Sequence, residues 1–172
     1  MLKDLSREAE FAAEAEVPTV GEAAPVDLAK INTLHELLAL ALDDFEKVIA
    51  DRRFMPNMNI YHAPGAAGAC HVCLAGGVMA MSLGCGDRGM WTTHSFGGGV
   101  RERLLALDRL RRGSVDGALE VLGKRRSRRA ETIARKWVVL LDQSSFAQGR
   151  RDSRRLLSKL RVMQRELAET GL

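Results

Sequence analysis

The sequence predicts a mainly α, compact helical domain with glycine-rich loops and room for one short β-hairpin. Apolar residues recur at three- and four-residue steps over long stretches, which is the period of one helix face. No stretch of useful strand length alternates between apolar and polar residues. The chain has 172 residues, enough for one domain with a buried core.

We expect two parts, an acidic N-terminal arm and linker over residues 1–26 and a single helical domain over residues 27–172. Pro18 and Pro25 fit no helix interior, so they bracket the linker. The first helix of the domain is expected to run from Asp27 for about six turns. Its apolar stripe consists of Leu28, Ile31, His35, Leu38, Leu42, Phe45 and Ile49.

Residues 52–69 contain two prolines and no apolar period, so they predict a loop. Residues 70–83 predict a helix of unusual composition, rich in glycine and alanine. Each glycine costs roughly 1 kcal/mol of helix propensity, so another part of the chain is expected to approach that helix closely. The candidate hairpin pairs residues 57–63 with residues 90–96.

The C-terminal half predicts helices that are separated by capping signals. A helix from about Val100 ends at Gly113, and Ser114 caps the short helix that follows. Ser127 is expected to cap the next helix. The last helix is expected over residues 153–170. Its inward-facing residues are Leu156, Leu160, Met163 and Leu167.

The cysteines suggest a zinc site. Cys70 and Cys73 form a C-x-x-C pair, a spacing at which two thiolates reach one zinc ion at ~2.3 Å. A closed site needs two further ligands, for which Cys85, His62, His71 and His94 are available, with Cys85 and His62 as the candidates, so zinc is the candidate cofactor. His71 stands inside the pair, and this position excludes c-type haem attachment.

A second interpretation makes the chain a Cys–His nucleophilic enzyme centred on Cys70. A thiolate at a helix N-terminus has a lowered pKa, and the expected helix starts at Cys70. His62 or His94 would accept its proton. In a third interpretation Cys70 and Cys73 only pack, because free cysteine behaves as a small apolar residue. This interpretation is the simplest, and all three stay open.

The glycine-rich loop suggests a place for a phosphorylated small molecule. Gly97, Gly98 and Gly99 precede a helix, where free backbone N–H groups can hold a phosphate. Arg101 and Arg103 are close enough in sequence to add positive charge. The alternative is a plain flexible connection, since the loop lacks the G-K-[ST] ending of a Walker A motif.

The charges are unevenly distributed along the chain. Residues 1–60 carry a net charge of −6 and residues 101–172 a net charge of +10, counted from Lys, Arg, Asp and Glu. Such polarity indicates an anionic partner, which would be nucleic acid, an acidic protein surface or the acidic half of the same or a neighbouring chain in a homo-oligomer. The expected binding residues are Arg125, Arg126, Arg128 and Arg129 at a helix start, with Arg154, Arg155 and Arg161 on the last helix.

We expect a cytoplasmic protein without a membrane partner. No apolar run reaches the ~18 residues that a membrane span needs. The N-terminus lacks the basic start and apolar core of a secretory signal. The three cysteines are an odd number, which argues against a secreted disulfide framework.

The stretch YHAPGAAGACHVCLAGGVMA over residues 61–80, followed by LLALDRLRRG over residues 104–113, resembles a group of small uncharacterised proteins of bacteriophages and prophages. The likeness rests on Tyr61 and His62, the C-x-V-C-L-A-G core at 70–76 and V-M-A at 78–80. It implies a phage product in the host cytoplasm that acts by binding, on the host or on its defences. It implies no catalytic residue. We therefore expect a binding or regulatory protein.

Overall fold

The computed structural model describes residues 26–65, 68–85, 90–125, 127–144 and 147–172, with the backbone alone at 139 and 141–144. The predicted acidic arm therefore lies outside the described residues, apart from Val26, and so does Arg126. The described chain is mainly helical, as predicted. Its α-helices are α1 (Leu34–Ala50), α2 (Leu74–Ala80), α3 (Gly98–Arg111), α4 (Val115–Val121), α5 (Arg128–Ser144) and α6 (Gly149–Thr170).

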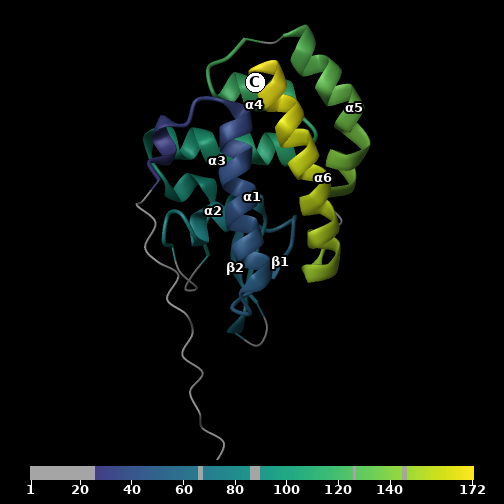
Figure 1. The fold of residues 1–172 in the computed structure, drawn as a ribbon. Helices are drawn as coiled ribbons and strands as arrows, with labels where there is room; N and C mark the ends of the chain where they lie inside the picture. The colour runs from purple at the N-terminus through teal and green to yellow at the C-terminus, as the bar shows by residue number, and fades with distance from the viewer. Residues whose placement is uncertain (1–25, 66–67, 86–89, 126, 145–146) are drawn as a thin grey trace, which may run out of the picture.

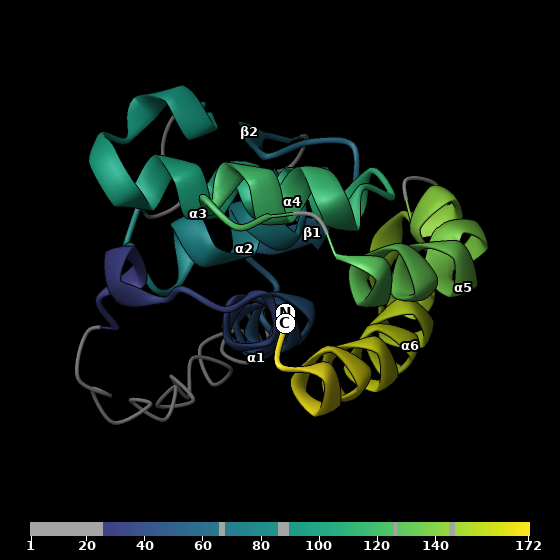
Figure 2. The same ribbon diagram turned by 90° about the horizontal axis from the view of Figure 1, so that it is seen from above.

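Helix α1 is the centre of the molecule (Figure 1). It packs against α6 on one side and α2 on another, while α5 lies outermost beside α6 (Figure 2). Its apolar stripe is buried, as at Leu38, Leu42 and Phe45. This burial is the main reason for its stability, since helices of this length gain most of theirs from packing.

The first helix is shorter than its apolar stripe predicts. Residues Leu28–Lys30 form a separate 3-10 turn, η1, and Thr33 has an extended backbone. The Thr33 hydroxyl donates a hydrogen bond to the Glu36 carboxylate at 2.5 Å. The Thr33 hydroxyl is therefore not the acceptor for the N–H groups in the first turn of α1. The main-chain oxygen of Leu172 accepts the N–H of Leu34 instead, at 2.5 Å. The end of α6 thus meets the start of α1.

Two short strands interrupt the loop predicted over residues 52–69, and a third strand that follows the loop joins them in a small sheet. Its strands are β1 (Phe54–Pro56), β2 (His62–Pro64) and β3 (Cys70–Val72), in the order β1-β3-β2. β1 runs parallel to β3, and β2 runs antiparallel to it. The hairpin predicted between residues 57–63 and 90–96 is not formed. One isolated antiparallel bridge joins these two segments, between His62 and Trp91. Strands of three residues are too short for their alternation to stand out in a sequence.

The predicted caps of the C-terminal half are confirmed. The Ser114 hydroxyl accepts the backbone N–H of Gly117 at 3.0 Å, and the Ser127 hydroxyl accepts that of Ala130 at 3.0 Å. Helix α6 starts at Gly149, four residues before its predicted start at Ser153. Its predicted inward face is buried at Leu156, Leu160, Met163 and Leu167. In the described ranges no helix has both the length and the apolar composition to cross a membrane.

Candidate functional site

The helix predicted over residues 70–83 is present but shorter, as α2 over Leu74–Ala80, so the prediction that it starts at Cys70 is wrong. Cys70 lies in β3, where Phe54 and Pro64 are its partners on the two neighbouring strands. Cys73 is the N-cap residue of α2. Each cysteine residue is only 1% exposed. The helix-start argument for a reactive thiolate therefore no longer applies to Cys70.

Cys73 occupies the helix start instead, but its thiol is buried. Burial raises the pKa of Cys73, and this effect outweighs the N–H groups of Gly76 and Ala75 and the nearby Arg111, which act in the opposite direction. A raised pKa keeps the sulfur protonated at neutral pH, and a protonated thiol is a poor nucleophile. Both cysteines of the pair therefore fit the packing interpretation best.

The structure places His62 near the cysteines and His94 elsewhere. His62 is buried in β2, opposite Val72 and therefore on the same sheet face as Cys70. His94 is exposed, with its Nδ1 atom 3.0 Å from a guanidinium nitrogen of Arg101. Cys85 is half-buried beyond the end of α2, and its thiol contacts the carbonyl oxygen of Leu83. Among the described residues no three or more His, Cys, Asp or Glu side chains form a group that could hold a metal ion. Zinc stays a prediction.

Gly76 shows what approaches the small-residue helix. A Cβ atom at this position would lie 1.4 Å from the carbonyl oxygen of Tyr61. The same oxygen accepts the N–H of Cys73 at 3.4 Å. The expected close approach to this helix is therefore made by the chain just before β2, and it belongs to the core.

Next to Tyr61 lies a buried polar cluster that the sequence analysis did not predict. Arg111 donates to Asp108 at 2.7 Å, and both side chains are only 8% exposed. Arg112 contacts the other carboxylate oxygen of Asp108 at 3.0 Å. Burial alone would raise the pKa of Asp108, but a hydrogen bond with Tyr61 and the charges of Arg111 and Arg112 hold it below its usual value. The D-x-x-R-R spacing on a predicted helix was the available signal.

The glycine-rich loop is tied to the fold. α3 starts at Gly98, which has φ +53°, and a Cβ at Gly99 would lie 3.1 Å from Ala29 of η1. The guanidinium of Arg103 donates to the carbonyl oxygens of Ile31 at 2.9 Å and of Gly99 at 3.3 Å, and to the side chain of Asn32 at 2.7 Å, so its donors are used within the fold. Of the two predicted phosphate-binding arginines, the structure therefore places only Arg101 on the surface.

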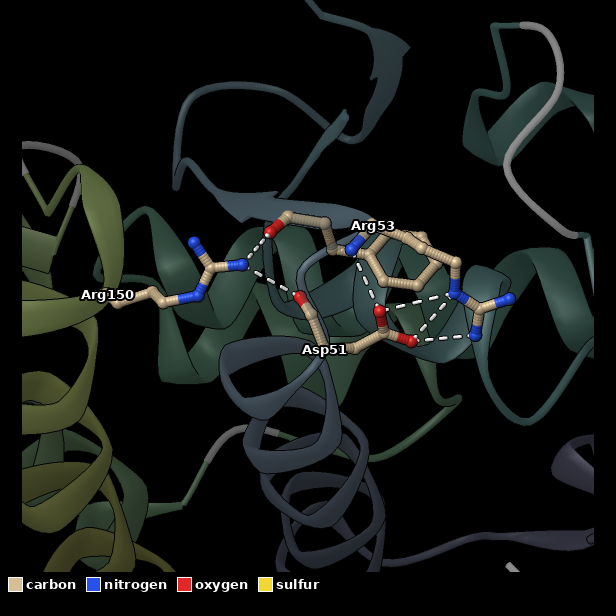
Figure 3. Close-up of polar contacts among 4 residues, drawn as sticks. Asp51, Arg53 and Arg150 are labelled. Atoms are coloured by element: carbon tan, nitrogen blue, oxygen red, sulfur yellow. Dashed lines mark hydrogen bonds and ion pairs between the residues drawn. The ribbon is translucent and has the colours of Figure 1, made fainter. Parts of the chain in front are cut away.

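Arg150 joins the start of α6 to the end of α1 (Figure 3). Its guanidinium donates to the carbonyl oxygens of Ile49 at 3.0 Å, Asp51 at 2.8 Å and Phe54 at 2.8 Å. On the far side of the same turn, Arg53 contacts the Asp51 carboxylate at 2.7 Å. The hydrogen bonds from Arg53 hold the pKa of Asp51 below its usual value, and burial opposes them. The contacts of Arg150 and Arg53 form a corner of the fold, which holds the start of α6 against the end of α1.

Two of the arginines predicted to bind an anion instead contact acceptors within the fold. Arg161 contacts Asp43 at 2.6 Å and Glu46 at 3.1 Å, both on the exposed side of α1. Arg129 donates to the carbonyl oxygen of Thr170 at 3.3 Å, near the end of α6. Part of the charge asymmetry is thus neutralised within the chain.

The exposed basic residues at the start of α5 and along the outward side of α6 form what we call the basic face. In α6 these residues lie on the side of the helix away from the buried stripe. Within the described part of the chain, the side chains of the basic face have no ion pair or hydrogen-bond partner. The basic face consists of the exposed residues Arg125, Arg128, Arg151, Arg154, Arg155, Lys159 and Arg165.

No protein-family model, no curated protein and no solved structure matches this chain. Two features of the described chain stand out as candidate sites, the buried C-x-x-C segment and the basic face. Only the basic face presents its functional groups to solvent.

Proposed function

We propose that the protein is a binding protein that holds nucleic acid through the phosphate groups, with the basic face as its contact surface. The observation that carries this proposal is the contrast among the arginines. Arg103, Arg111, Arg150 and Arg161 each have a carboxylate or carbonyl acceptor in the fold. The side chains of the basic face have none among the described residues.

The start of α5 strengthens the case for an external anion. Arg125 and Arg128 stand at a helix N-terminus, where the macrodipole disfavours positive charge by a few tenths to about 1 kcal/mol each. An anion opposite them removes this unfavourable interaction. Arginine forks also match phosphate oxygens better than lysine does.

The composition of the basic face favours nucleic acid over an acidic protein. Protein interfaces usually centre on buried apolar or aromatic anchors. In the described parts of α5 and α6 the large apolar residues that are exposed are two valines, Val138 at 50% and Val162 at 39%. Phosphate contacts need no such anchor. An acidic protein surface is the outcome that the experiment below would detect instead.

The test compares two charge reversals of equal size. Arg154→Glu changes a residue of the basic face, and Arg109→Glu changes an exposed residue of α3 that is not part of the basic face. Fluorescence anisotropy at low salt should show wild-type protein binding a labelled nucleic acid, a loss of about ten-fold in affinity for Arg154→Glu, and little change for Arg109→Glu. Both variants should keep the wild-type melting temperature. Equal effects of the two variants, or binding to polyglutamate without binding to nucleic acid, would overturn the proposal.

The resemblance to phage proteins supports a context for this function. A phage product of this kind would act in the host cytoplasm, on the host or its defences. The Cys–His enzyme and the phosphate-binding loop stay as alternatives. For the loop, the specific observation is that His94 and Arg101 lie together on the surface near the start of α3.

A further inference from the structure

We infer that the nucleic acid is a duplex, and that the two ends of the α5–α6 pair hold phosphates about 24 Å apart on it. This inference rests on the proposed function and names the substrate class. It is carried by the placement of two groups of arginines and by the aromatic residues of the two helices.

The two groups lie at opposite ends of an antiparallel helix pair. Arg125 and Arg128 precede or open α5, while Arg151, Arg154 and Arg155 lie in the first turns of α6. The contact between Arg129 and Thr170 places the start of α5 beside the end of α6. Figures 1 and 2 show the two helices side by side.

A second contact fixes the pair closer to its middle. The indole N–H of Trp137 donates to the Glu166 carboxylate at 2.6 Å, and Lys136 forms an ion pair with the same carboxylate. The pair therefore acts as a spacer of defined length, because neither helix can slide past the other without losing these contacts.

Helix geometry sets the distance between the groups. From Arg154 to Thr170 the chain rises about 1.5 Å per residue, which gives a separation of roughly 24 Å. Lys159 and Arg165 lie between the two groups. On a duplex, with about 3.4 Å of rise per base pair, this distance corresponds to about seven base pairs.

The aromatic residues argue against a single strand. Proteins that hold single strands stack the bases on exposed aromatic side chains. In the described parts of α5 and α6 the aromatic residue is Trp137, which is half-buried and has Lys136 over its ring at 5.3 Å from the centroid. Because the described parts of the two helices present no open platform for stacking, the basic face there offers phosphate contacts. A duplex presents phosphates at the fixed spacing that such a face can use.

The experiment uses the full chain and three DNA probes, a hairpin with a 5-base-pair stem, a hairpin with a 14-base-pair stem, and an unpaired strand with as many nucleotides as the longer stem. The quantity measured is the slope of log K against log salt, at about −0.9 per phosphate contact on duplex DNA. The long stem should engage both groups. The short stem, about 17 Å long at the same rise, should engage one group at a time and give a shallower slope.

A double variant shows whether both ends are used. Arg125→Gln with Arg128→Gln should make the slope on the long stem shallower by about 1.8, which corresponds to two lost contacts. The same variant should leave the slope on the short stem unchanged, because that stem binds at the larger group on α6. A thermal melt checks that the variant is folded, and both side chains are exposed and without partners among the described residues.

The outcomes separate this inference from the proposed function. Equal slopes on the two stems, or a single strand bound as tightly as the long stem, would overturn the duplex inference and leave nucleic-acid binding intact. Failure to bind any of the three probes at low salt would overturn both. A shallower slope for the double variant on the short stem as well would contradict the two-ended arrangement.

Discussion

The carbonyl oxygen of Tyr61 occupies the space in which a side chain at Gly76 would begin. A Cβ at Gly76 would lie 1.4 Å from this oxygen, whereas a Cβ at Gly77 would lie 3.7 Å from the nearest atoms, in Phe45 and Val48. Two neighbouring glycines of one helix therefore have different roles. Gly76 lets the backbone of Tyr61 pass close to α2, whereas Gly77 packs against α1 at an ordinary van der Waals distance.

We predict that Gly76→Ala destabilises the protein by about 3 kcal/mol or more, because the crossing chain must move to make room. Gly77→Ala should be neutral or stabilising by up to about 1 kcal/mol, since alanine has the higher helix propensity. Urea denaturation of both variants measures the difference. Equal stability of the two variants would contradict the close approach of Tyr61.

Arg150 should contribute far more to the free energy of unfolding than its neighbour Arg151. Arg150→Met removes the donor to three carbonyl oxygens at the end of α1 and in β1, and we expect a loss of about 2 kcal/mol or more. The control is Arg151→Met, which changes an exposed side chain and should stay within about 0.5 kcal/mol of the wild type. If both variants melted alike, the corner shown in Figure 3 would not hold α6 to α1.

Asp108 should give the protein a specific sensitivity to acid. Its pKa is lower in the folded chain than its ordinary value of about 3.9, so its stabilising effect is complete above that value and is lost as the pH falls through the lower, folded pKa. Asp108→Asn should cost about 3 kcal/mol at pH 7, because Arg111 then loses its buried counter-charge.

The wild-type advantage over Asp108→Asn should therefore shrink below about pH 4. Urea denaturation of both proteins at pH 7 and pH 3 tests this, and the variant serves as the reference for all other titrating groups. The same free-energy gap at both pH values would show that folding does not lower the pKa of Asp108, and a larger gap at pH 3 would show that folding raises it.

The sequence predicted those features that depend on local pattern. The buried stripe of α6 from Leu156 to Leu167 follows from helix periodicity, and the caps at Ser114 and Ser127 follow from the hydrogen bond that a serine can offer to the next turn. Each needs only residues that are near one another in the chain.

Features that depend on distant partners were missed. Strand β3 pairs with β1 and β2, so the helix predicted from Cys70 onward gave way to three residues whose conformation is set by their neighbours in the sheet. The acceptors of Arg150 lie about a hundred residues earlier in the chain. Nothing in the basic composition of residues 101–172 distinguishes this arginine from Arg151, which is exposed.

The thiols should differ in reactivity. Cys85 is half-buried, while Cys70 and Cys73 are buried in the core. A thiol reagent added to native protein should modify one cysteine quickly and the other two only on unfolding, and Cys85→Ser should remove the fast phase. Rapid modification of Cys70 in the folded protein would contradict the packing interpretation and favour the Cys–His enzyme.

Zinc can be tested in the same preparation. The packing interpretation expects purified protein without stoichiometric zinc and a melting curve that a chelator leaves unchanged. A structural zinc ion would instead make chelation unfold the protein, because its binding energy is also folding energy. One zinc ion per chain together with a lowered melting temperature in chelator would establish the metal site.

The most direct test of the central claim is the salt dependence of binding to a long DNA duplex. If the whole basic face contacts phosphates, log K should fall against log salt with a slope of about −6, and Arg154→Gln with Arg155→Gln should make it shallower by about 1.8. The melting temperature of the double variant should match that of the wild type. A slope that the double variant leaves unchanged, or no binding by the wild type at low salt, would contradict the account.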